Sequence, residues 1–160
     1  MQVIGFNFTK MHSEKSPEFK QGSINTNIEF TDLQKEKVDI LKDLEAVKIN
    51  FSFSINYGDV VKNSDKKNND KKENENKDPA DSLLAQIKFD GLIVLSTSKD
   101  ELKDLQKSWK KKELPQAARL ALFNMILKKT APRALQLQDE LNLPSHIPIP
   151  QVQSKPNTDQ

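Results

Sequence analysis

Eleven residues in the first half of the sequence constrain the fold more than any other stretch. From Val47 to Tyr57 the sequence reads VKINFSFSINY, in which apolar and polar residues alternate without a break. Successive side chains of a β-strand point to opposite faces, so this segment predicts a strand with one apolar and one solvated face. Such strands are typical of an antiparallel sheet that packs one face on a core.

Three further segments carry a similar signal. INTNIEF, residues 24–30, alternates in the same way, and VIGFNF near the start does so more briefly. AQIKFDGLIVLS, residues 85–96, alternates up to Gly91 and then becomes continuously apolar. A lone glycine in a strand is typical of a bulge or bend, and a continuous apolar run is typical of a strand buried on both faces. The sequence therefore predicts four strands before the first helix.

Two helices are predicted after the strands. Ser98 and Glu101 have the spacing of a capping box, which marks the start of the first helix. The second helix is expected within LPQAARLALFNMILKK, residues 114–129, where Pro115 suits the first helical turn. Apolar residues surround much of this second helix, so one sheet face is not enough to cover it. We expect the following tail, a second subunit or a bound partner to cover the rest.

The stretch after the second helix combines apolar residues with prolines. LQLQDELNLPSHIPIPQV, residues 135–152, contains Pro144, Pro148 and Pro150. Because proline lacks a backbone donor and fixes φ, we expect this whole stretch to be irregular rather than helix or strand. Apolar side chains on such a segment either cap the core or line a binding surface.

One long segment has no apolar periodicity. Residues 62–82 consist almost entirely of Lys, Asn, Asp and Glu, and we expect a disordered hairpin loop that is dispensable for folding. The sequence as a whole predicts an α+β fold in one domain over residues 1–152, with a disordered end at 153–160. Within it, a four-stranded antiparallel sheet precedes two C-terminal helices and an irregular Pro-rich tail.

Residues able to do chemistry are sparse. The chain has no cysteine and only four glycines, none of them in a phosphate-binding pattern. His12 and His146 lie in separate segments without metal-ligand spacing, and we interpret His146 as an exposed loop histidine. We therefore expect no enzyme, no metal and no cofactor. The N-terminus shows no signal peptide and no stretch is long enough to insert into a membrane, so we expect a cytoplasmic protein.

A basic excess marks the helical part of the chain. From Lys99 to Arg133 there are ten basic and four acidic residues, including the run WKKKE at 109–113. Such a patch could bind RNA or an acidic protein, with Lys110, Lys111, Lys112, Lys128 and Lys129 as candidate residues. The other interpretation is that Trp109 belongs to the core and that the lysines solvate the end of a helix.

The order of these elements resembles the SecB family of export chaperones. IGFNFTK resembles the first strand of that family, and INTNIEF through INYG resembles the second and third strands. AQIKFDGLIVLS is similar to the fourth strand. ELPQAARLALFNMILKK looks like the second helix, where Pro115 and Arg119 match a proline and an early arginine of the family. PRALQLQDELNLP resembles the segment that follows this helix.

The resemblance implies a non-catalytic holdase that binds unfolded or precursor polypeptides in apolar grooves and forms a homo-oligomer, a tetramer in that family. The candidate polypeptide-binding residues are Phe6, Phe8, Ile28, Phe30, Phe123, Ile126, Ile147 and Ile149. The family is acidic whereas this chain has a net charge of +2, so no acidic docking surface for the export motor SecA is visible and that partner is left open. In the alternative, the basic helical face serves an RNA- or complex-binding assembly module.

Overall fold

The computed structural model describes residues 1–20, 22–36, 45–58 and 83–150. Its elements are β1 (Gln2–Lys15), β2 (Ser23–Glu36), β3 (Glu45–Gly58), β4 (Leu83–Thr97), α1 (Lys99–Trp109) and α2 (Gln116–Glu140). The predicted α+β fold, a four-stranded sheet followed by two helices, is confirmed. The segments predicted to be disordered, 62–82 and 153–160, lie outside the described residues.

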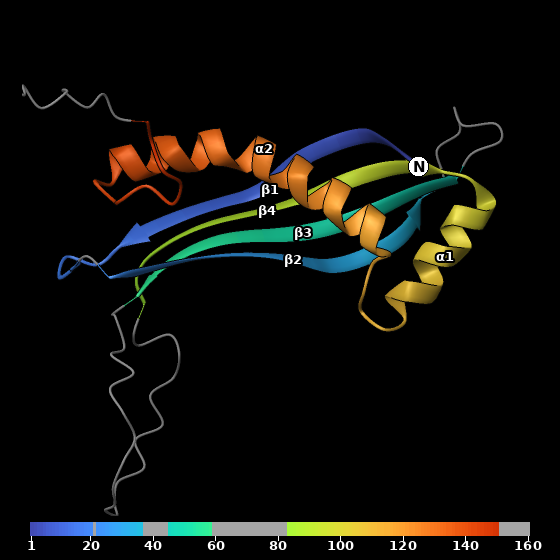
Figure 1. Ribbon diagram of the computed structural model, residues 1–160, viewed down its shortest axis with the longest axis horizontal. Helices are drawn as coiled ribbons and strands as arrows, with labels where there is room; N and C mark the ends of the chain where they lie inside the picture. The colour runs from blue at the N-terminus through green and yellow to red at the C-terminus, as the bar shows by residue number, and fades with distance from the viewer. Residues whose placement is uncertain (21, 37–44, 59–82, 151–160) are drawn as a thin grey trace, which may run out of the picture.

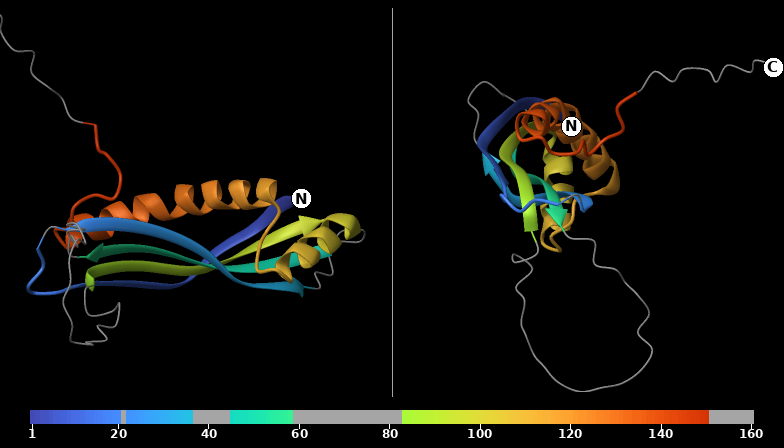
Figure 2. Two further views of the ribbon diagram at one scale, coloured as in Figure 1. Left: turned by 60° about the horizontal axis from the view of Figure 1, so that its bottom comes forward. Right: turned by 90° about the vertical axis from the view of Figure 1, so that its left-hand side faces the viewer.

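The strands form one antiparallel sheet in the order β1-β4-β3-β2. The two strands that come first in the chain therefore lie at the two edges, and each leaves one side of its backbone without a neighbouring strand in the described chain. Figure 1 shows α2 lying across one face of the sheet and α1 standing at one end of it. Figure 2 shows the same arrangement from two further directions, with both described helices away from the opposite face of the sheet.

Strict alternation places the core on the sheet face below α2. The apolar residues of β3 are at most 1% exposed, while the polar residues between them are half-buried on the opposite face. The same face of β4 contributes Ile87, Phe89, Ile93 and Leu95, each with no exposed surface. On the opposite face of β4, Leu92 and Val94 are only half-buried, so the prediction that this strand end is buried on both faces is wrong.

Gly91 allows a close approach between strands rather than a bend in its own strand. A Cβ atom at this position would lie 2.6 Å from the Asn7 carbonyl oxygen and 2.6 Å from Cζ of Phe51. The irregular register lies across from it in β1, between Phe8 and Lys10. The bulge predicted at Gly91 is therefore in the neighbouring strand, and the missing side chain leaves room for the Phe51 ring.

The capping box predicted for the first helix is present. The Ser98 side chain accepts from the backbone N–H of Glu101, and the Glu101 side chain accepts from the backbone N–H of Ser98. Both partners satisfy N–H groups that have no acceptor within the first turn. This local pattern starts α1 directly after β4.

The second helix is longer than the sequence predicts. It continues through Pro132 to Glu140, so the expectation that residues 135–152 are irregular is wrong for its first six residues. Pro132 removes one hydrogen bond and crowds the carbonyl one turn earlier, but no proline follows it before Pro144, so the helix resumes after this single disturbance. Buried residues on both sides of Pro132, Thr130 and Ala134, continue the packing of the helix on the sheet.

The chain leaves α2 through a C-terminal capping motif. Asn142 adopts a left-handed φ of 49°, its N–H donates to the Asp139 carbonyl, and the N–H of Leu143 donates to the Gln138 carbonyl. This is the pattern of a Schellman motif, in which asparagine or glycine occupies the left-handed position. The irregular tail, residues 141–150, is therefore the segment that follows this motif. Within the described ranges, no helix is long and apolar enough to cross a membrane.

Candidate polypeptide-binding surface

Every fourth residue of α2 faces the sheet. The buried series is Ala118, Leu122, Ile126, Thr130, Ala134 and Gln138. Four residues exceed one helical turn by about 40°, so the buried side rotates by about 200° along the helix as it follows the twisted sheet. The residue after each buried one therefore lies on one flank of α2, and the residue before each buried one lies on the other flank.

The flank facing β2 is mostly apolar. Its series is Arg119, Phe123, Leu127, Ala131 and Leu135. The Phe123 ring stacks on the Phe30 ring of β2, with centroids 5.4 Å apart and planes inclined by 14°. Ile28 lies two residues from Phe30 on the same strand face and is also half-buried. Leu127 is 38% exposed, so this flank presents apolar surface to solvent.

The outward side of α2 and the irregular tail expose further large apolar residues. Leu120, two residues after a buried position, is 54% exposed. In the tail, Ile147 is 39% exposed and Ile149 is 60% exposed. We name Ile28, Phe30, Leu120, Phe123 and Leu127 the α2 surface, and treat Ile147 and Ile149 as its neighbours in the chain.

The β1 side of the sheet carries aromatic packing within the sheet and a cavity against α2. Phe6 packs against Phe8 and Phe51, with centroid separations of 5.2 and 5.3 Å, and both β1 residues are half-buried. Farther along, a cavity of about 250 Å³ opens between β1 and the last turns of α2. Its lining is Met11, His12, Ser13, Arg133, Gln136, Leu137 and Glu140. Met11, which sequence reasoning missed, is 58% exposed there.

The structure separates the predicted polypeptide-binding residues into three groups. Ile147 and Ile149 are exposed, and five residues are half-buried at the margins of the core: Phe6, Phe8, Ile28, Phe30 and Phe123. Ile126 has no exposed surface, because it belongs to the series of α2 that faces the sheet. Ile126 is therefore a core residue in this structure. The binding role of the others stays a prediction.

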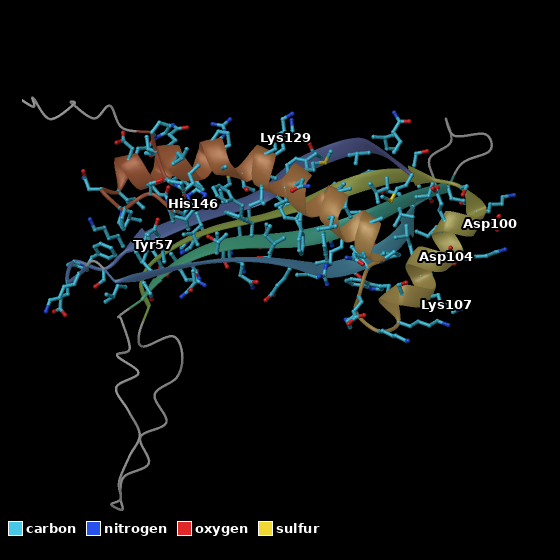
Figure 3. All side chains as sticks on the ribbon, in the orientation of Figure 1. Tyr57, Asp100, Asp104, Lys107, Lys129 and His146 are labelled. Carbon is cyan, nitrogen blue, oxygen red and sulfur yellow. The ribbon has the colours of Figure 1, made fainter. Side chains whose placement is uncertain are left out.

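A buried polar network holds the tail on the sheet, and sequence reasoning missed it. Tyr57 of β3 donates to the Pro144 carbonyl across 3.0 Å, and the Gln138 side-chain amide donates to the Tyr57 hydroxyl. Nδ1 of His146 lies 3.0 Å from Oε1 of Gln138, a carbonyl oxygen that only accepts, so Nδ1 is the donor. Figure 3 shows Tyr57 and His146 near the same end of the sheet, below the last turns of α2.

His146 is therefore not the exposed loop residue that the sequence suggests. Its ring packs edge-on against Phe53 with centroids 6.4 Å apart, and its Nε2 is buried without a hydrogen-bond partner among the described residues. Burial lowers the pKa of His146, since a charged imidazolium is poorly solvated there. Burial also raises the pKa of Tyr57, while the hydrogen bond from Gln138 partly offsets this change. The sequence did carry a signal for the burial of Gln138, because this residue continues the series of every fourth residue that faces the sheet.

The candidate basic residues form two groups rather than one patch. Lys110, Lys111 and Lys112 are exposed in the turn after α1, where Lys112 Nζ lies 5.7 Å from the centre of the half-buried Trp109 ring. Lys128 and Lys129 are exposed about 18 Å along α2 from its first residue, at 1.5 Å per residue. Figure 3 places Lys129 along the middle of α2, away from the turn that follows Lys107.

Within the described residues, no group of three or more His, Cys, Asp or Glu side chains could hold a metal ion.

No protein-family model and no curated protein matches the sequence. Among solved structures, the chain is similar to the SecB-like chaperone Rv1957 of Mycobacterium tuberculosis, solved in complex with a ChAD peptide from the Rv1956 HigA1 antitoxin. That similarity has 15% identity and a TM-score of 0.42, and it covers 97% of this chain and 91% of the other. We therefore base the functional proposal on this chain's own surfaces.

Proposed function

We propose that this protein is a non-catalytic chaperone that holds unfolded or precursor polypeptides on the α2 surface. One observation carries the proposal: besides its buried side, the helix exposes large apolar side chains, Leu127 on the flank facing β2 and Leu120 on the outward side. Leu120 and Leu127 are 54% and 38% exposed, although polar residues at these positions would leave the core unchanged. Exposed apolar groups that the core does not need are typical of interaction surfaces.

The arrangement suits partners without a fixed shape. Leu120 and Leu127 are exposed along the helix rather than around a closed pocket, so an extended segment can contact them in sequence. Apolar contacts are non-directional, and binding of this kind needs no particular client sequence and no ATP. The resemblance to SecB extends the proposal to a cytoplasmic homo-oligomer, a tetramer in that family, which acts on precursors in protein export.

The test is suppression of aggregation of a chemically unfolded client, at low and high salt. Leu120→Gln and Leu127→Gln remove apolar surface while keeping a good helix former. We expect both variants to stay folded and to lose anti-aggregation activity. Asn124→Gln, on the outward side of the same helix, is the matched control and should keep full activity. Full activity in both leucine variants would refute the proposal.

A core substitution calibrates this experiment. Ile126→Ala removes a side chain with no exposed surface and should destabilise the fold by about 2–5 kcal/mol. The exposed leucines should change the free energy of unfolding by less than about 0.5 kcal/mol, as is usual for surface positions. Circular dichroism during urea unfolding separates these two classes before activity is measured.

The assembly module remains a second candidate because Lys110, Lys111 and Lys112 are all exposed beside Trp109. In that case RNA binding should fall steeply with salt and disappear when the three lysines are changed to Gln.

Light scattering across micromolar concentrations tests the proposed homo-oligomer separately. A monomer throughout that range would contradict the proposed assembly.

A further inference from the structure

The charges on α2 are of one sign over nearly its whole length. From Gln116 to Gln138 the helix contains Arg119, Lys128, Lys129 and Arg133 and no acidic residue. The four cations lie on three sides of the helix: Arg119 on the flank facing β2, Lys128 outward, and Lys129 and Arg133 on the flank facing β1. The α2 surface is therefore bordered by positive charge.

These four cations have no carboxylate partner within the described part of the chain. Three other described lysines do have such a partner, among them Lys35 with Glu45 at 2.8 Å and Lys103 with Asp100 at 3.6 Å. Arg119 instead lies over the Phe123 ring, with its guanidinium carbon 5.8 Å from the ring centre. A guanidinium placed in this way keeps its N–H donors free for an incoming carboxylate.

The spacing of the cations matches an extended peptide. At 1.5 Å per residue along the helix axis, Arg119 and Lys128 are about 13 Å apart, and Arg119 and Arg133 are about 21 Å apart. Because Arg133 lies on the opposite flank, a segment that reaches both arginines crosses the outward side of α2. An extended chain advances about 3.3 Å per residue, so these intervals correspond to about four and six peptide residues. Leu120 and Leu127 lie within that interval and would contact apolar side chains between the acidic ones.

The same surface is poorly suited to nucleic acid. Single-stranded RNA is bound by aromatic rings that stack on bases and by a continuous line of cations. On α2, Phe123 is already stacked on Phe30 and lies beneath Arg119, and the exposed residues between Arg119 and Lys128 are Leu120, Ala121, Asn124 and Leu127, none of them aromatic. Aliphatic side chains offer no stacking partner to a base, whereas they contact apolar peptide side chains well.

From these observations we propose that the polypeptides held on α2 are extended segments that combine apolar residues with acidic ones, and that Arg119, Lys128, Lys129 and Arg133 bind the acidic side chains. This inference rests on the proposed chaperone function and specifies its substrate class. Surface charge contacts are individually weak, so several together should favour an acidic segment over a neutral one by about tenfold at low salt.

The experiment is fluorescence anisotropy with three labelled peptides of equal length and equal apolar content, carrying acidic, neutral or basic residues between the apolar ones. An RNA oligonucleotide and an acidic peptide without apolar residues complete the set. We expect the acidic apolar peptide to bind about tenfold more tightly than the neutral one at low salt, and the difference to vanish near 0.5 M salt. The acidic peptide without apolar residues should bind much more weakly than either.

Two variants with equal change in net charge decide the assignment. Arg119→Gln, Lys128→Gln, Lys129→Gln and Arg133→Gln together should abolish the acidic preference and leave neutral binding in place. The matched control changes four lysines elsewhere to Gln and should keep the preference. Lys10, Lys48 and Lys88 lie on the sheet face opposite α2, and Lys99 lies at the start of α1.

The outcomes separate this inference from the chaperone proposal. Binding of the neutral peptide tests the chaperone function itself, and its absence would remove that function. Neutral binding with equal affinity for acidic and basic peptides would overturn only the charge inference. The inference is also overturned if the control variant loses the preference as well, or if RNA binds more tightly than the acidic peptide and is released by the α2 substitutions.

Discussion

The polar network at the end of α2 makes a quantitative prediction about the tail. Tyr57→Phe removes a single oxygen from a site where Tyr57 is 1% exposed and Gln138 is 2% exposed. The ring stays, so packing is preserved. Two groups lose their partner: the side-chain amide of Gln138, which donates to the hydroxyl, and the Pro144 carbonyl, which accepts from it across 3.0 Å.

The expected cost follows from the burial of these groups. The Pro144 carbonyl is near the surface and can bind water, but the Gln138 amide is enclosed between α2 and β3. One buried donor without a partner costs about 1–3 kcal/mol. For a domain of this size, each kcal/mol lowers the melting temperature by about 2–4 °C, so we expect a decrease of about 2–12 °C.

A double-mutant cycle with Gln138→Leu separates the hydrogen bond from other effects. In the double variant neither partner of the Tyr57–Gln138 bond remains, whereas Nδ1 of His146 loses its acceptor in the Gln138→Leu single variant and in the double variant alike, so that loss cancels in the cycle. The destabilisation of the double variant should therefore be clearly smaller than the sum of the two single effects. Thermal and urea unfolding supply the free energies, and hydrogen exchange of residues 141–150 reports release of the tail. Single effects that add to within about 0.5 kcal/mol would refute the network as described.

Three further predictions concern other parts of the fold. Because burial lowers the pKa of His146, the unfolded chain binds its proton first as pH falls below the ordinary value of about 6.5. Stability should therefore decrease over that range, and His146→Asn should remove this part of the slope in urea unfolding at a series of pH values. Gly91→Ala should destabilise by about 1–3 kcal/mol, since the new Cβ would meet the Asn7 carbonyl and the Phe51 ring at 2.6 Å. An unchanged urea midpoint would show that the strands move apart freely. Ser98→Ala removes the helix cap and should cost about 1 kcal/mol, whereas Ser98→Asp should keep most of the stability in the same measurement.

Much of this fold is readable from local patterns. The alternation from Val47 to Tyr57 depends only on the two-residue period of a strand, and the structure buries every apolar member of that series. The capping box at Ser98 involves residues three apart, so its geometry is also local. These features let the sequence alone predict the four strands, the two helices and their order. The order of strands within the sheet, with β4 between β1 and β3, needed the tertiary structure.

The candidate surface depended on packing that no local pattern contains. Proline at 132 disfavours a helix locally, yet burial of Thr130 and Ala134 against the sheet outweighs that cost and carries α2 on to Glu140. The apolar residues of α2 look equivalent in sequence, and only the rotation of the buried series against a twisted sheet puts Ile126 in the core and leaves Leu127 at the surface. The network of Tyr57, Gln138 and His146 joins residues more than 80 positions apart, and so depends on how the tail folds back below α2.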